Sequence, residues 1–276
     1  MKTGREINRF GIQIIAYVTM FVDHFAVILL YPLLTGSAVQ DASIPEPISY
    51  SILRKIGRLS FPLFAFMISE GVAYTQNGIK YFVRLLLLSL ASIIPYGLVF
   101  QTYGVNHICS NVLFTLSIGA LMLLLVKHIE EKFTCRKELS RLLQGIIILL
   151  SATAAQLIHA DYGLYGVILI LLFYICRRNR NRIFPVCGLW MVGGCCLYYT
   201  ALILQEYSFA EFKSWGVNVF GQICAESVLA NCCAIFSLFI IYFYNGKEGT
   251  KIPRVVTYLF YPVHLILLWV VAKAIL

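Results

Sequence analysis

Long apolar runs, separated mostly by short polar turns, follow one another along almost the whole chain. A helix needs about 20 predominantly apolar residues to cross a membrane. The pattern predicts nine transmembrane helices, and a break between the fifth and sixth is expected around the segment HADYGLYG. The predicted helices cover residues 12–34, 52–75, 81–103, 109–128, 142–160, 162–176, 183–204, 219–244 and 255–276.

The composition supports a membrane protein. Of the 276 residues, 60% are hydrophobic and 13% are charged, whereas soluble domains have about 45–50% apolar and about 25% charged residues. The nine cysteines include no CxxC pair and no zinc-type spacing, so we interpret them as small packing residues and predict no metal site. The expected fold class is an all-α polytopic helical bundle in contact with membrane lipids, with residues 1–276 forming a single domain.

The distribution of Lys and Arg predicts the orientation of the helices. With the N-terminus in the cytoplasm, 17 of the 22 Lys and Arg residues lie on the cytoplasmic side. This excess is the positive-inside pattern of membrane proteins. The net charge of +9 is therefore explained by topology and does not indicate nucleic acid as a partner. The five exceptions are Arg54, Lys55, Arg58, Lys213 and Lys273.

An odd number of spans places the C-terminus on the outer side of the membrane, opposite the N-terminus. We therefore expect alkaline phosphatase fused after Leu276 to be active in cells and a fluorescent protein fused there to stay dark. A fluorescent C-terminal fusion would mean that a span has been miscounted.

Four ionisable side chains interrupt the apolar runs at similar depths. On the predicted helices, His24 lies about 15 Å from the outer end of its span, Arg58 about 9 Å and His264 about 18 Å. Asp23 precedes His24 directly. An ionisable group in mid-membrane costs about 2.5–3.5 kcal/mol on insertion scales and is a functional hypothesis by default. The coincidence of Asp23, His24, Arg58 and His264 predicts one intramembrane site.

Adjacent residues on a helix point about 100° apart, so Asp23 is badly placed to orient the ring of His24. We expect Asp23 to neutralise Arg58 and His24 to act in acid–base chemistry, with His264 as a second candidate base. A purely structural ion pair between Asp23 and Arg58, and a structural role for His264, remain open alternatives.

A second feature is the cytoplasmic segment YFYNGKEGTKIPR, residues 242–254. Its two glycines allow a ligand to approach the backbone, and Lys247, Lys251 and Arg254 are candidates for contacts with phosphate groups. An ordinary positive-inside turn is the alternative interpretation.

The chain resembles the TraX family of bacterial membrane proteins, named after a conjugation protein that N-acetylates pilin. The resemblance covers nearly the whole length and rests on segments that occur in order: IIAYVTMFVDHFAVILL, IGRLSFPLFAFMISEGVAYTQNGIKYFVRLLLLSLASIIPY, NVLFTLSIGALML, YGLYGVILILLFY, YNGKEG and YLFYPVHLILL. The family is similar to the transmembrane acyltransferases, which pass acetyl groups from cytoplasmic acetyl-CoA to acceptors at or across the membrane.

The resemblance implies that particular residues occupy the family's motif positions: Asp23, His24, Gly57, Arg58, Phe61, Pro62, Glu70, Arg84, Pro95, Asn111, Tyr261, Pro262 and His264. It also implies a location in the bacterial cytoplasmic membrane. The sequence lacks the long soluble N-terminal extension of the pilin enzyme, which leaves the acceptor open.

The expected function is transfer of an acetyl group from acetyl-CoA to an amine or hydroxyl of a peptide, glycan or small molecule. His24 is the expected general base or transient acyl carrier. We expect Lys247, Lys251, Arg254 and Arg84 to hold the donor. Arg58, a catalytic candidate, and Asn111 are expected to hold the acceptor or the oxyanion, and Asn111, Glu70 and Tyr261 are the expected substrate-binding residues. Two alternatives stay open: a proton-coupled transporter that uses Asp23, His24 and His264 as a relay, and a non-catalytic assembly factor.

Overall fold

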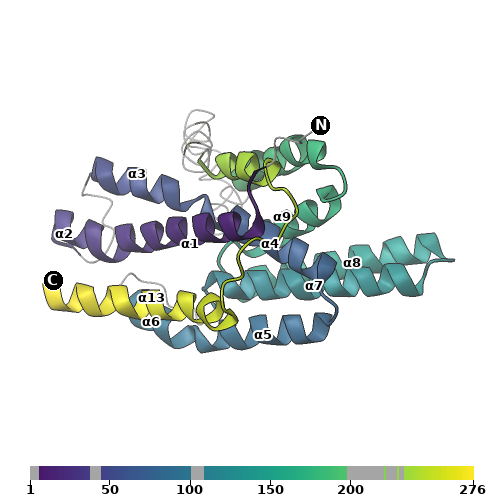
Figure 1. Cartoon of the computed structure of the whole chain (residues 1–276), viewed down its shortest axis with the longest axis horizontal. Coiled ribbons are helices and arrows are strands. Elements are labelled where there is room, and N and C mark those ends of the chain that lie inside the picture. The colour runs from purple at the N-terminus through teal and green to yellow at the C-terminus, as the bar shows by residue number, and fades with distance from the viewer. Residues whose placement is uncertain (1–5, 38–44, 101–108, 198–220, 222–228, 230–232) are drawn as a thin grey trace, which may run out of the picture.

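The computed structural model describes residues 6–37, 45–100, 109–197, 221, 229 and 233–276. These residues are almost entirely helical, as Figure 1 shows. The elements are α1 (Arg9–Phe25), η1 (Ala26–Leu30), α2 (Tyr31–Thr35), α3 (Ile48–Gly57), α4 (Ser60–Tyr74), α5 (Gly78–Ala91), α6 (Ile93–Phe100), α7 (Val112–Lys132), α8 (Lys137–Leu157), α9 (Gly163–Cys176), η3 (Arg180–Arg182), η4 (Ile183–Cys187), η5 (Trp190–Gly194) and α13 (Arg254–Ile275).

Six continuous segments in the described part of the chain are long and apolar enough to cross a membrane. They are Arg9–Thr35, Ile48–Tyr74, Gly78–Phe100, Val112–Lys132, Lys137–Leu157 and Val255–Ile275. Two shorter apolar helices, Gly163–Cys176 and Cys233–Tyr242, accompany them. The predicted all-α polytopic membrane bundle is confirmed. The count of nine spans stays a prediction, because parts of the predicted helices 183–204 and 219–244 lie outside the described residues.

The breaks within the spans have local causes. Pro95 has no backbone N–H that could donate to the carbonyl of Ala91. The helix is therefore interrupted between Ala91, where α5 ends, and Ile93, where α6 begins. Between α8 and α9, His159 and Tyr162 adopt left-handed backbone angles, with φ of 55° and 62°. This turn confirms the predicted break in HADYGLYG.

The core of the bundle forms where α4, α7 and α9 pack against one another. Large side chains that are almost fully buried, among them Phe66, Met122 and Phe173, fill this region. Gly166 of α9 allows the close approach, because a Cβ atom there would overlap Thr115 and Phe61. Packing of this kind fixes the turn before α9 against the inner part of the molecule.

The first and last spans lie side by side and run in the same direction (Figure 1). The start of α1 is held by the segment before α13: Ile7 forms a parallel bridge with Tyr244, and the N–H of Arg9 donates to the carbonyl of Lys247 at 2.8 Å. Asn8 caps α1 by accepting from the N–H of Gly11 at 2.9 Å. The basic C-terminal segment therefore lies against the N-terminus of α1.

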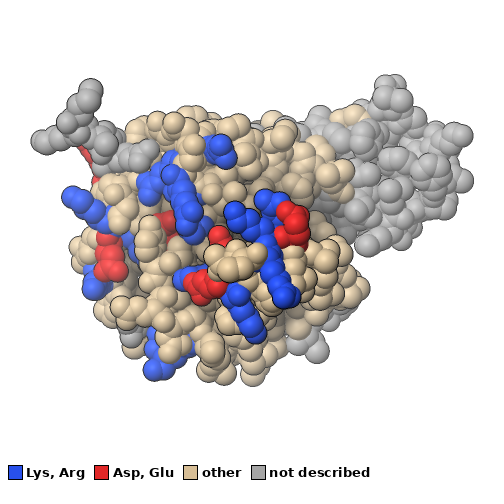
Figure 2. All heavy atoms as spheres, turned by 90° about the vertical axis from the view of Figure 1, so that its right-hand side faces the viewer, with Lys and Arg blue, Asp and Glu red and all other residues tan. Residues whose placement is uncertain are grey.

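Lys and Arg side chains gather at one end of the molecule (Figure 2). It is the right-hand end of Figure 1, where α5 begins and α7 ends. A concentration of positive charge at one end of parallel and antiparallel spans agrees with the predicted orientation, in which this end faces the cytoplasm.

Candidate functional site

Two histidines from the first and last spans form a hydrogen-bonded pair. Nδ1 of His24 lies 2.7 Å from Nε2 of His264, and the rings stack with centroids 4.9 Å apart. His264 is buried, with 4% of its surface exposed. The prediction that these two side chains share one depth is therefore supported by the geometry.

The next hydrogen bond determines which nitrogen of each ring carries a proton when both rings are neutral. Nδ1 of His264 lies 2.7 Å from the backbone carbonyl of Phe260, and a carbonyl can only accept. Nδ1 of His264 therefore donates, its Nε2 accepts, and Nδ1 of His24 is the donor to it. This arrangement leaves Nε2 of His24 with a free lone pair, the form that a general base requires.

Aromatic side chains surround the pair. The ring of Tyr261 meets both imidazoles edge-on, with centroids 6.1 Å from His24 and 5.7 Å from His264. Phe260 stacks on His264 at 5.0 Å, and Phe100 contacts His24 at 5.7 Å. The irregular π-helix η1 begins two residues after His24. Such π-helical turns are frequent at functional sites.

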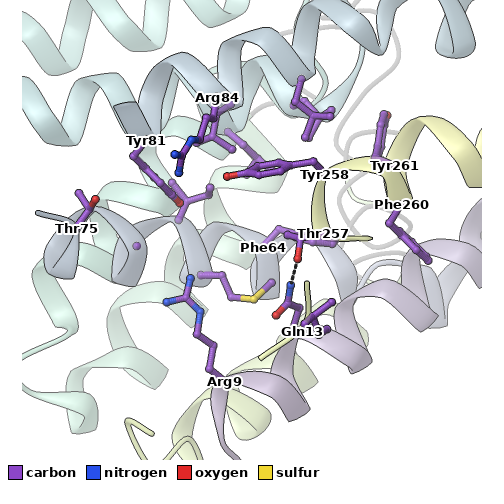
Figure 3. Close-up of a pocket in the computed structure, with 18 of the residues that line it drawn as sticks. Arg9, Gln13, Phe64, Thr75, Tyr81, Arg84, Thr257, Tyr258, Phe260 and Tyr261 are labelled. Atoms are coloured by element: carbon purple, nitrogen blue, oxygen red, sulfur yellow. Dashed lines mark hydrogen bonds between the residues drawn. The ribbon is translucent and has the colours of Figure 1, made fainter. Parts of the chain in front are cut away.

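A pocket of about 840 Å³ leads towards this pair between α1, α4, α5, α7 and α13 (Figure 3). Its volume falls within the range of about 300–1,000 Å³ that is typical of ligand sites. Arg9 of α1 and Arg84 of α5 lie on opposite walls, and Lys80 and Lys251 add positive charge. Its other end is lined by apolar and aromatic side chains that include Met20, Leu116, Phe260 and Tyr261.

The pocket walls continue directly into the histidine pair. On α1, the lining residues Arg9, Gln13, Tyr17 and Met20 follow a helical face, and His24 is the next position on that face. On α13, Thr257 and Tyr261 line the pocket and His264 follows in the same way. Arg9 and Met20 are separated by about 16 Å along the helix axis. The pocket therefore runs from cationic to apolar surroundings and ends one helical turn before His24.

Only two of the four residues predicted to hold the acetyl donor line the pocket. Arg84 and Lys251 line the pocket, and Lys251 also pairs with Glu248 at 3.2 Å. Lys247 is exposed in the turn before α13, outside the lining residues, and Arg254 is the first residue of α13. Arg9 and Lys80, which the sequence placed only among the topological charges, are lining residues. The backbone hydrogen bonds that hold Ile7 and Arg9 against residues 243–247 explain the arrangement, because they bring Arg9 to the pocket.

The expected pairing of Asp23 with Arg58 is wrong. Asp23 Oδ2 accepts from Arg54 at 2.6 Å. The second span begins at Ile48, four residues earlier than predicted. As a result, Arg54 occupies the depth that the sequence assigned to Arg58. Gly57 lies directly against the Asp23 carboxylate and allows α3 to approach α1 at this point.

Arg58 lies at the break between α3 and α4 and donates to the hydroxyl of Tyr162 at 3.4 Å. Tyr162 stacks on Phe61 with centroids 3.8 Å apart. Asp161, beside it in the same turn, lies within electrostatic reach of Arg58 and Asp23. Asp161 was not among the predicted site residues; its only signal in the sequence was a carboxylate in the predicted break between two spans.

Two predicted substrate residues lie beside the pocket. Asn111 is fully buried and caps α7, with its side-chain oxygen accepting from the N–H of Leu113 at 3.1 Å. Glu70 is buried on α4 and lies within electrostatic reach of Arg180 and Arg9. Its neighbours Ile68 and Gly71 line the pocket. Neither Asn111 nor Glu70 is a lining residue. Both support the helices that form the pocket walls.

The fold and the site define a helical membrane protein with a hydrogen-bonded histidine pair at the inner end of a charged-to-apolar pocket. The protein-family model described as TraX protein matches residues 9–272 of the chain. The chain therefore belongs to the TraX family, as its sequence motifs indicated.

The chain is also similar to the probable fimbrial assembly protein FimC, serogroup H1, of Dichelobacter nodosus. The two are 28% identical over 279 residues, and the match covers 97% of each chain. No solved structure matches the chain.

The pairing of Asp23 with Arg54 can be tested by exchanging charges. We expect Arg54→Asp alone to lower the melting temperature in detergent, because two carboxylates then meet at a partly buried contact. Combining Arg54→Asp with Asp23→Arg should restore most of the lost free energy of unfolding, which we expect to be about 2 kcal/mol. The reason is that a hydrogen bond between charged groups forms again.

The matched control adds Arg58→Asp to Asp23→Arg. We expect its melting temperature to be no higher than that of Asp23→Arg alone, whereas adding Arg54→Asp to Asp23→Arg should raise it. Equal or better rescue by the Arg58 combination would contradict the pairing seen in the structure.

Proposed function

We propose that the protein is a membrane-embedded acetyltransferase that transfers an acetyl group from cytoplasmic acetyl-CoA to an amine or hydroxyl acceptor. The observation that carries the proposal is the continuity of the pocket with the histidine pair. Two helix faces, on α1 and α13, lead from positive charge to His24, whose Nε2 lone pair is free when both rings are neutral.

The pocket suits the donor molecule in both of its parts. Arg9, Lys80, Arg84 and Lys251 supply positive charge for phosphate groups near the basic end of the molecule. The apolar inner half suits an uncharged arm and a thioester. The transition from charge to apolar walls occurs along about 16 Å of α1, so the two ends of an extended ligand meet different chemistry.

His24 is the proposed general base. As the acceptor nitrogen or oxygen attacks the thioester carbonyl, Nε2 of His24 accepts its proton; a C–N or C–O bond forms and the C–S bond breaks. The same proton then passes to the departing thiolate. His264 is a positioning residue in this scheme, because its Nε2 accepts from Nδ1 of His24 and keeps the other nitrogen unprotonated.

Assembly of a surface appendage is a second candidate, supported by the name of the Dichelobacter nodosus relative. In that case the histidine pair and the ion pair would stabilise the helix packing only. Acetyl transfer distinguishes the two candidate functions, because an assembly factor does not need to transfer acetyl groups.

The test is acetyl transfer from radiolabelled acetyl-CoA into envelope fractions, with purified protein in nanodiscs added to membranes that lack it. We expect His24→Ala to lower the rate about 100- to 10,000-fold, the usual contribution of a general base. We expect His264→Ala to lower it by a smaller factor, because the base is still present but its tautomer is no longer fixed.

His128→Ala is the matched control, because His128 is exposed on α7 and should leave the rate unchanged. Full activity of His24→Ala would exclude His24 as the base. Absence of any acetyl transfer by the wild-type protein would favour the assembly function.

A further inference from the structure

Among the side chains at the inner end of the pocket, Tyr261 is the one that contacts both histidines. Tyr261 is 4% exposed, lines the pocket and touches both imidazole rings with its edge. Figure 3 shows it on α13 beyond Thr257 and Tyr258, at the end away from the cluster of Arg84, Tyr81 and Thr75. His24 and His264 lie behind the lining residues. Tyr261 is therefore a lining residue of the pocket that also contacts the proposed base.

Three rings pack against His24, which is itself partly exposed. The centroid distance of 6.1 Å between the rings of Tyr261 and His24 corresponds to edge-to-face contact. Phe100 makes a similar contact with the imidazole at 5.7 Å, and His264 stacks on it at 4.9 Å. An acyl group that reaches His24 would pack against these rings, so the space that they leave would limit its length.

We propose that Tyr261 sets the length of the acyl group that the protein transfers, admitting acetyl and excluding longer linear chains. The inference rests on the proposed acetyltransferase function and adds the residue that selects the donor. The chemical step is unchanged: the C–S bond of the thioester breaks, the acyl carbon bonds to the acceptor, and His24 carries the proton between them.

The experiment compares acetyl-CoA with butyryl-CoA as donors for wild-type protein, Tyr261→Ala and Tyr261→Phe. We expect Tyr261→Ala to raise the ratio of kcat/KM for butyryl to that for acetyl at least about tenfold, since one methylene in a fitted apolar pocket changes selectivity about 10- to 200-fold. Tyr261→Phe keeps the ring, so its ratio should match that of the wild type.

Tyr258→Ala is the matched control, because Tyr258 lines the pocket from the same helix but one turn nearer the charged end. We expect it to alter KM for both donors in parallel and to leave their ratio unchanged. Tyr261→Leu provides a variant of intermediate size in case Tyr261→Ala does not fold, and its ratio should lie between the two.

Equilibrium binding gives a second measurement that requires no turnover. Butyryl-CoA should bind Tyr261→Ala more tightly relative to acetyl-CoA than it binds the wild-type protein. The proposal is overturned if the Ala and Leu variants transfer acetyl but keep the wild-type ratio, or if wild-type protein accepts butyryl as readily as acetyl. Failure of the wild-type protein to transfer acetyl at all is a distinct result, which removes the proposed function and this inference with it.

Discussion

The hydrogen bond between His24 and His264 joins the two ends of the chain inside the membrane domain, and the proposed site depends on it. It brings the first and last spans together at 2.7 Å through side chains that are 240 residues apart in sequence. The carbonyl of Phe260 fixes the direction of this bond, since it can only accept from His264. When both rings are neutral, one backbone carbonyl thus determines that Nε2 of His24 is free to take a proton. No charged group has to be buried to achieve this, which is an advantage where charge is costly.

Charges near the pair have a separate role. Asp23 and Arg54 join α1 to α3 directly beside His24, and the close fit of Gly57 against the carboxylate makes the contact possible. A partly buried ion pair contributes little net stability, but the loss of one partner leaves a charge without compensation. We infer that this pair holds the register of α1 relative to α3. Arg58 and Tyr162, one turn away, extend the polar layer to the turn before α9.

Much of the fold could be predicted from the sequence, because apolar runs of membrane length carry a strong signal. The bounds were shifted by a few residues, and one shift had a chemical consequence. A start at Ile48 moved Arg54 to the level of Asp23, so the ion pair was assigned to the wrong arginine. The bond between His24 and His264 could be anticipated only as a shared depth. Arg9 could not be recognised as a pocket residue, since its position depends on a backbone bridge between Ile7 and Tyr244.

The central claim is that the cationic end of the pocket receives a phosphate-bearing donor whose other end reaches His24. The most direct measurement is the dissociation constant of acetyl-CoA for purified protein in nanodiscs, compared with the Arg9→Ala, Arg84→Ala and Lys247→Ala variants. The account predicts Kd increases of about tenfold or more for the two pocket arginines, because a charge-assisted contact contributes about 1.5–3 kcal/mol. It predicts no change for Lys247, which lies outside the pocket. Equal affinity in all four proteins, or no binding by the wild type, would contradict it.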